Sequence, residues 1–193
     1  MAVELVYETH STTTDNEAGI ATGHLPGRLS EAGRRQAAEL GARRRDGGFA
    51  AVFTSDLHRA VETGRIAFPD GVPPLHQDVR LRECDYGELN GAPASLVAAR
   101  RLRHVDEPFP GGQSYRQVVA ATDALLHDLA ARWDGRRVLL IAHSANRWAL
   151  DHLLTGVPLV EVLAPPPPPG GGGGEAQPGP RAPPPPLCGR LHK

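Results

Sequence analysis

Three residues that can bind an anion or move a proton, His10, Arg59 and His143, each follow a short apolar run of the sequence. In open parallel sheets the carboxyl ends of the strands meet at one edge, where helix N-termini add backbone N–H donors and a partial positive charge. If the apolar runs are neighbouring strands, the two histidines and the arginine gather there. Taken singly, a histidine at a strand end is ordinarily a polar loop residue, so their joint placement is what indicates an anion site.

The elements that must position these residues are predicted from an alternation of apolar and amphipathic stretches. Ser30 and Ser55 precede two of the amphipathic stretches as candidate N-cap residues. The run RVLLIA is continuously apolar, as in a strand buried on both faces of a parallel sheet. Strands are expected at 3–8, 50–54, 73–80 and 137–142, helices at 31–45, 57–68, 113–133 and 146–154, and irregular chain at 81–110 with a helical stretch at 96–103.

This order of elements implies βαβ units. We therefore predict an α/β fold, a three-layer sandwich with a mostly parallel central sheet and helices on both faces. Neither a Walker loop nor a GxGxxG pattern occurs, which argues against a nucleotide-binding version of the fold.

Charge and composition exclude several partners. With 21 basic and 22 acidic residues the formal net charge is −1, so the chain has no basic field for nucleic acid or an anionic membrane. Two cysteines, Cys84 and Cys188, make neither a disulfide framework nor a CxxC metal pair, which favours a reducing compartment. Since no apolar run approaches 18 residues and no leader pattern is visible, we expect a cytoplasmic protein.

The composition changes near residue 164, and we expect a domain over residues 1–163. Of the last 30 residues, 18 are Pro or Gly, a composition that cannot bury enough apolar surface to offset the entropy of ordering. Residues 164–193 are therefore predicted to be a disordered tail. Three origins remain open for it: an inert tail, a polyproline II recognition segment, or the product of a shifted reading frame in GC-rich DNA.

Six blocks of the sequence match a known pattern in the same order. They are LVYETHSTTTDN at 5–16, GHLPGRLSEAGRRQA at 23–37, TSDLHRA at 54–60, RLRE followed by YG at 80–87, PGGQS at 110–114 and VLLIAHS at 138–144. Together, over about residues 3–163, they resemble the histidine phosphatase superfamily, the phosphoglycerate-mutase-like proteins. The resemblance implies the fold of that family and a phosphoryl-transfer site.

The resemblance also implies a role for each principal residue. A phosphoryl group needs a nucleophile with a free ring nitrogen, donors around its oxygens and an acid for the leaving oxygen. His10 would be the nucleophile and form a phosphohistidine, Arg59 would clamp phosphate oxygens, and His143 would stabilise the developing charge. Glu83 would protonate the leaving alkoxide, which requires a raised pKa. No metal or organic cofactor is implied.

Further phosphate donors are implied around this set. They are Asn16, Ser11, Thr13, Gly23 and the backbone N–H of Ser144. Alternatives from the residues themselves stay open: Arg59 as a solvated surface residue, Glu83 as the ion-pair partner of Arg80 or Arg82, and Asn16 as a residue that shapes a turn.

The chain departs from the family pattern beside the nucleophile. The family has Arg before the histidine and Gly after it, whereas this chain has Thr9 and Ser11, with Glu8 one residue further back. One phosphate-binding guanidinium is therefore missing, and Glu8 adds repulsion if its side chain faces the site. Substitute donors can come from the hydroxyls of Ser11, Thr12 and Thr13 or from the guanidiniums of Arg28 and Arg147.

Two functions from different classes follow. The first is a metal-independent phosphatase acting on small-molecule phosphomonoesters; the second is a module that binds or senses a phosphate-bearing ligand with little catalysis. A metal-dependent hydrolase using His10, Asp15 and His143 lacks a ligand-spacing motif. Hydrolysis is favoured over mutase activity because only 27 residues lie between Glu83 and Gly111. Which ester is used and the oligomeric state stay open; contacts for specificity are expected within 84–110, where Arg100, Arg101, Arg103 and His104 lie.

Overall fold

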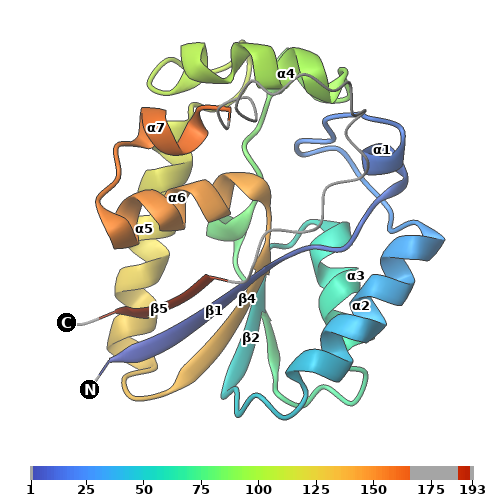
Figure 1. The fold of residues 1–193 in the computed structure, drawn as a ribbon, viewed down its shortest axis with the longest axis vertical. Coiled ribbons are helices and arrows are strands. Elements are labelled where there is room, and N and C mark those ends of the chain that lie inside the picture. The colour runs from blue at the N-terminus through green and yellow to red at the C-terminus, as the bar shows by residue number, and fades with distance from the viewer. Residues whose placement is uncertain (1, 166–186, 192–193) are drawn as a thin grey trace, which may run out of the picture.

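A sheet of four parallel strands, extended by one antiparallel strand, forms the centre of the computed structural model, which describes residues 2–165 and 187–191. The strand order is β3-β2-β4-β1-β5 (Figure 1). The strands are β1 Val3–Thr9, β2 Ala51–Thr54, β3 Leu75–Gln77, β4 Arg137–Ala142 and β5 Leu187–Leu191. Because β1 and β2 flank β4, the strand ends that lead to His10, Ser55 and His143 are neighbours.

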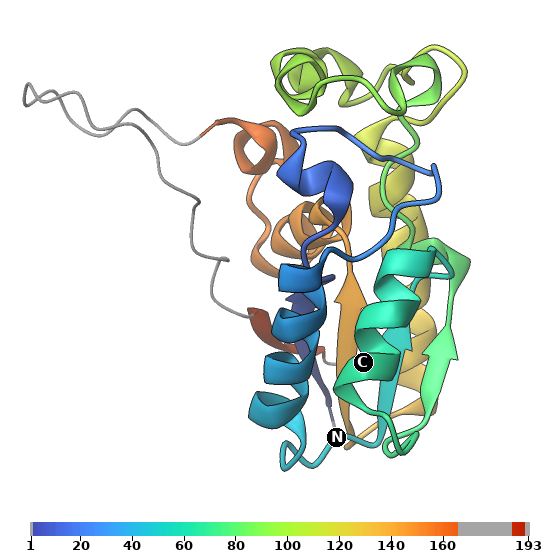
Figure 2. The same ribbon diagram turned by 90° about the vertical axis from the view of Figure 1, so that its right-hand side faces the viewer.

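Helices cover both faces of this sheet. Figures 1 and 2 show α2 and α3 on one face and α5 and α6 on the other, with α1 and α4 beyond the carboxyl ends of the strands. The helices are α1 Thr14–Glu17, α2 Glu31–Arg44, α3 His58–Ala67, α4 Ala94–Arg100, α5 Tyr115–Arg132, α6 Ser144–Thr155 and α7 Leu159–Leu163, with short 3-10 helices at Val79–Leu81, Gly87–Leu89 and Arg101–His104. The predicted three-layer α/β sandwich with a mostly parallel sheet is confirmed.

The core forms on both sides of β4. All five residues of Val138–Ala142 are fully buried. Leu140 packs in the cluster that includes Leu125 of α5, while Leu139 packs with Leu40 of α2. Neighbouring residues of a strand point to opposite faces of a sheet, so a continuously apolar run satisfies both layers of helices at once.

Most predicted elements lie within two residues of their observed bounds. Some elements and one helix cap differ from the prediction. The strand expected at 73–80 is only β3, followed by a 3-10 turn that Asp78 begins by accepting the N–H of Arg80. The helical stretch expected at 96–103 is α4 continued by a 3-10 turn. Ser30 is the N-cap of α2 as predicted, but Ser55 does not cap α3, whose N-cap is Leu57.

Within the tail predicted to be disordered, the structure describes Leu187–Leu191. These residues form β5 and pair antiparallel with β1, with Leu191 opposite Val3 and Leu187 opposite Tyr7. The physical reason is local composition: LCGRL follows the last proline run and contains no proline, so its backbone N–H groups can satisfy the free edge of β1. The rest of the predicted tail, residues 166–186 and 192–193, lies outside the described residues.

Candidate active site

His10 follows β1 and is held at the carboxyl edge of the sheet. Its backbone N–H donates to the carbonyl of Ala142 at the end of β4, at 2.9 Å. Its ring Nδ1 lies 2.8 Å from the carbonyl oxygen of Ser11, and because a carbonyl can only accept, Nδ1 carries the hydrogen. Nε2 therefore carries the lone pair. Burial, and next the positive charge of Arg59, lower the pKa of His10 to about 4, so the ring is neutral at pH 7.

His143 follows β4 and is fully buried beside His10. The two ring centroids are 5.0 Å apart. Its Nε2 lies 2.7 Å from the hydroxyl oxygen of Ser55, and the hydroxyl of Tyr7 donates to its backbone carbonyl. Its Nδ1 has no hydrogen-bond partner among the described residues. Burial, with the charges of His10 and Arg59, lowers its pKa well below the ordinary range.

Arg59 lies in the first turn of α3 and is only 2% exposed. Its guanidinium donates to the carbonyl of Gly23 at 2.7 Å and to that of Leu25 at 3.5 Å. Its own carbonyl accepts from Thr63, whose hydroxyl oxygen also accepts the backbone N–H of Ser11. The cation is thus fixed to the same framework as the segment that holds His10.

Gly23 has no space for a side chain. Its φ is +53°, and an added Cβ would lie 1.8 Å from the amide oxygen of Asn90. Glycine is the residue that adopts this conformation without steric cost, and it lets the backbone carbonyl reach Arg59.

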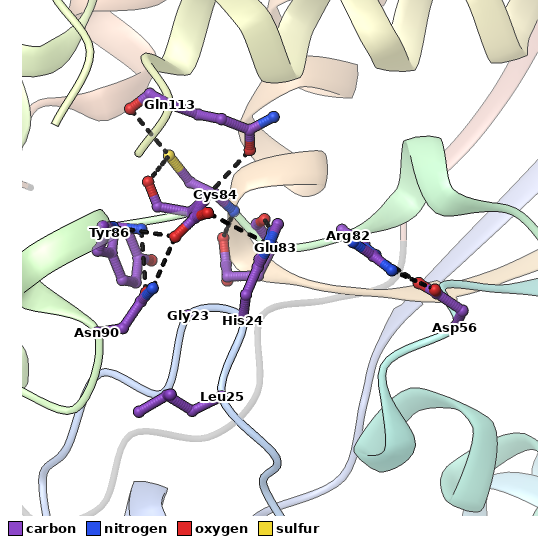
Figure 3. A network of polar contacts seen from close by, with 12 residues as sticks. Gly23, His24, Leu25, Asp56, Arg82, Glu83, Cys84, Tyr86, Asn90 and Gln113 are labelled. Atoms are coloured by element: carbon purple, nitrogen blue, oxygen red, sulfur yellow. Dashed lines mark hydrogen bonds and ion pairs between the residues drawn. The ribbon is translucent and has the colours of Figure 1, made fainter. Parts of the chain in front are cut away.

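Glu83 faces this group from the segment before α4. The side chain is 8% exposed, and its Oε1 accepts the backbone N–H groups of Cys84 at 2.9 Å and Ala145 at 3.2 Å. Burial raises the pKa of Glu83 although these donors and Arg59 oppose the rise. Figure 3 shows this segment with its surrounding polar contacts. A raised pKa lets a carboxyl hold its proton at higher pH than usual, which is the direction that a general acid needs.

The alternatives raised for these residues from the sequence are resolved in part. Arg59 is buried and is not a solvated surface residue. Glu83 is not the partner of the neighbouring arginines, because Arg80 pairs with Asp78 and Asp128 and Arg82 pairs with Asp56.

The remaining expected phosphate donors lie in two groups. Ser11 and Ser144 line a cavity of about 650 Å³ together with His10. Asn16 and Thr13 form a capping box at the start of α1, in which each side chain accepts the other's backbone N–H, and Asn16 is exposed. Asn16 therefore shapes a turn, as the alternative from the sequence has it, and its role toward phosphate stays a prediction.

The same cavity shows what surrounds Thr9, where the resemblance implies an arginine. Thr9 lines it, and so does Arg147 of α6, whose Nε donates to Asp151 at 3.1 Å. Glu8 also borders it, but its carboxylate accepts from Arg44 at 2.7 Å, so its charge is largely neutralised. Arg28, the other candidate substitute, lines a separate cavity of about 400 Å³ with Arg34, His58 and Glu62.

Sequence reasoning missed two residues of the site. Ser55 was expected to cap a helix, yet it supports the ring of His143. The sequence places Tyr7 only in a strand, yet its hydroxyl donates a hydrogen bond to the carbonyl of His143, which lies 136 positions later in the chain. The one signal for Tyr7 in the sequence is its hydroxyl on an otherwise apolar strand, because a buried hydroxyl usually makes a hydrogen bond.

The three residues named for the metal-dependent alternative, His10, Asp15 and His143, do not form one group of ligands in the described part of the chain. In the described part of the chain, no three His, Cys, Asp or Glu side chains are grouped so that they can hold a metal ion. Asp15 instead accepts the hydroxyl of Thr22 at 2.8 Å.

Fold and site together define a class: a parallel α/β protein whose sheet edge holds two neutral histidines, a buried guanidinium and a buried carboxyl. The model of the histidine phosphatase superfamily (branch 1) matches residues 9–169, and the chain belongs to this superfamily. The predicted resemblance is therefore confirmed.

Curated relatives carry both mutase and phosphatase names. A 2,3-bisphosphoglycerate-dependent phosphoglycerate mutase of Methylobacterium sp. (strain 4-46) is 32% identical over 168 residues, which cover 79% of this chain and 81% of the relative. A glucosyl-3-phosphoglycerate phosphatase of Mycolicibacterium vanbaalenii is 31% identical over 172 residues, which cover 80% of this chain and 75% of the relative.

Solved structures agree with the fold. A protein described as mycobacterial hydrolase 1 superposes with a TM-score of 0.76 at 26% identity, covering 84% of this chain and 85% of that one. A mycobacterial glucosyl-3-phosphoglycerate phosphatase in complex with VO3 gives a TM-score of 0.73 at 27% identity, covering 83% and 85%. Among the residues that the structure describes, no helix is long and apolar enough to cross a membrane.

Proposed function

We propose that this chain is a phosphatase that hydrolyses small-molecule phosphomonoesters through a phosphohistidine at His10. The observation that carries the proposal is the state of the His10 ring: Nδ1–H is committed to the carbonyl of Ser11, and the low pKa leaves Nε2 unprotonated. A nucleophile needs that lone pair. Relatives named as phosphatases, among them the metal-independent phosphoserine phosphatase of Arabidopsis thaliana at 29% identity, support the reaction class.

In the first step, Nε2 of His10 attacks phosphorus. The N–P bond forms and the ester P–O bond breaks, while the carboxyl of Glu83 gives its proton to the leaving alkoxide and becomes a carboxylate. Arg59 holds phosphoryl oxygens by charge-assisted hydrogen bonds, and the ring of His143, whose centroid lies 5.0 Å from that of His10, is the second donor toward them. The buried site strengthens these contacts relative to water.

In the second step, water attacks the phosphohistidine. The Glu83 carboxylate takes a proton from the water, the N–P bond breaks, and inorganic phosphate leaves with His10 neutral again. Each residue returns to its starting protonation state, so this scheme balances without a metal or an organic cofactor.

Thr9 favours a second candidate, a phosphate-binding or regulatory module on the same fold. Where the family pattern has an arginine, Thr9 brings no charge to the cavity wall. The cation that acts on the pKa of both histidines is Arg59. Binding of phosphate needs fewer donors than stabilisation of a transition state, so weak catalysis with retained binding is the result this candidate expects.

Hydrolysis of p-nitrophenyl phosphate in excess chelator separates the two candidates. The phosphatase predicts turnover by the wild type that His10→Ala abolishes and that His127→Ala, an exposed histidine of α5, leaves unchanged. Wild type and His10→Ala that are equally inert on a panel of phosphate esters, while inorganic phosphate still raises the melting temperature, would support the binding module instead.

A further inference from the structure

We propose that His24 is a positioning residue. It holds the segment of the acid Glu83 against the loop whose carbonyls bind Arg59, and so aligns Glu83 to protonate the leaving group. This inference rests on the proposed phosphatase activity. It concerns a residue outside the phosphate-binding set and on a different loop from the acid.

The first contact joins His24 to the acid. Its Nε2 lies 2.7 Å from the backbone carbonyl of Glu83, and since a carbonyl only accepts, Nε2–H is the donor. The contact bridges 59 residues of sequence. Figure 3 shows His24 beside the Glu83 segment. Fixing this carbonyl limits rotation of the backbone from which the carboxyl extends.

The second contact is made by the neighbours of His24. The carbonyls of Gly23 and Leu25, on either side of it, accept from the Arg59 guanidinium. His24 is thus the residue through which one loop holds both the phosphate-binding cation and the acid. Movement of this loop would change the distance between them.

Asp85 lies beside the ring. Nδ1 of His24 lies 3.6 Å from a carboxylate oxygen of Asp85, a contact that is an ion pair only when the ring is protonated. The other carboxylate oxygen of Asp85 accepts from the backbone N–H of Gly87 at 2.9 Å and from the amide of Asn90 at 2.6 Å. The turn that carries Asp85 is therefore well anchored beside the imidazole.

Alignment of an acid matters in proportion to how much the leaving group needs its proton. A nitrophenolate leaves readily unprotonated, whereas an alkoxide does not. General acid catalysis is worth about 10²–10⁴-fold, and misplacement by about 1 Å can cost 10²-fold. Replacing a residue that positions the acid should therefore slow the hydrolysis of alkyl phosphates and leave the hydrolysis of aryl phosphates nearly unchanged.

The test compares His24→Ala and His24→Gln with wild type on p-nitrophenyl phosphate and on an alkyl phosphate such as glycerol phosphate. Glutamine places an amide N–H near the position of Nε2–H. We expect His24→Ala to lose about 10²-fold in kcat on the alkyl ester and less than about threefold on the aryl ester. His24→Gln should recover most of the alkyl activity. His58→Ala, a histidine that is 63% exposed, is the matched control.

Equal losses on both esters, or no recovery by His24→Gln, would overturn the assignment. Circular dichroism and melting curves show whether each variant folds, and the aryl ester reports the nucleophile in the same protein. Failure of the proposed function is distinguishable, because wild type would then hydrolyse neither ester. An unchanged alkyl rate in folded His24→Ala likewise contradicts the proposal.

Discussion

At the scale of single residues, burial decides which groups carry charge. His10 and His143 have lowered pKa values and stay neutral, while burial raises the pKa of Glu83. All three shifts have desolvation as their largest cause, and each moves its residue toward the state that the proposed phosphoryl transfer needs. Arg59 remains the cation, since a guanidinium does not lose its proton in proteins. Thr9 is the residue at which this arrangement lacks charge.

Replacing Thr9 with arginine tests that deficit. A charge-assisted hydrogen bond is worth about 1.5–3 kcal/mol, so a second guanidinium should raise kcat/KM by about 10-fold or more. The cavity of about 650 Å³ that Thr9 lines offers room for the side chain. Thr9→Gln, uncharged and also longer than threonine, is the control. Arginine and glutamine variants that both match wild type would show that no cation is missing, and would make Arg147 the residue to replace next.

At the scale of elements, close backbone contacts hold α2 against the segment that follows His10. A Cβ added to Gly33 in the first turn of α2 would lie 1.9 Å from the carbonyl oxygen of Thr12. That carbonyl accepts the backbone N–H of Ser30, the N-cap of α2. The helix start and the segment that follows His10 are therefore joined without a side chain between them.

Gly33→Ala tests this junction because two effects of the substitution would change the free energy of unfolding in opposite directions. In an exposed helix, glycine to alanine stabilises by about 1 kcal/mol. Here the added methyl group meets backbone that cannot move aside freely, so we expect a lower free energy of unfolding by urea and a lower kcat. Stabilisation with unchanged kcat would show that the backbone here accommodates a methyl group and that α2 does not fix the segment that follows His10.

How far the sequence predicts these elements depends on how local their causes are. The apolar run of β4 and the cap at Ser30 are local signals, and both elements lie where the sequence places them. Ser55 looks the same as Ser30 in sequence, yet its hydroxyl lies against His143, a residue 88 positions away. The contact of His24 with Glu83 and the pairing of β5 with β1 are equally long-range. Such contacts are set by the fold and have no periodic pattern to predict them.

At the scale of the whole molecule, the neutral histidines make stability depend on pH. An unfolded histidine binds a proton near pH 6.5, whereas native His10 does so only near pH 4. Between these values the unfolded state holds more protons, so the free energy of unfolding falls as pH falls. The contribution of neutral His10 to the free energy of unfolding is fully present above about pH 6.5 and is lost as the pH falls to about 4. Glu83, whose pKa is raised, acts with the opposite sign.

A comparison of variants isolates the histidine contribution. Urea unfolding of wild type and His10→Ala from pH 7 to pH 4.5 should show a shallower loss of stability in the variant, by up to about 1.4 kcal/mol per pH unit. His127→Ala, which removes an exposed histidine, should keep the wild-type slope. Identical slopes for all three proteins would mean that native His10 titrates like an unfolded histidine.

The proposed phosphatase activity depends on His10 carrying the phosphoryl group during turnover. Its most direct test is to mix wild type with excess aryl phosphate, quench within a turnover in alkali, where phosphohistidine survives, and read the digested peptides by mass spectrometry. We expect one added phosphoryl group on the peptide containing His10, and none in His10→Ala. Turnover by wild type with no phosphorylated His10 peptide, or with the phosphoryl group on another residue, would contradict it.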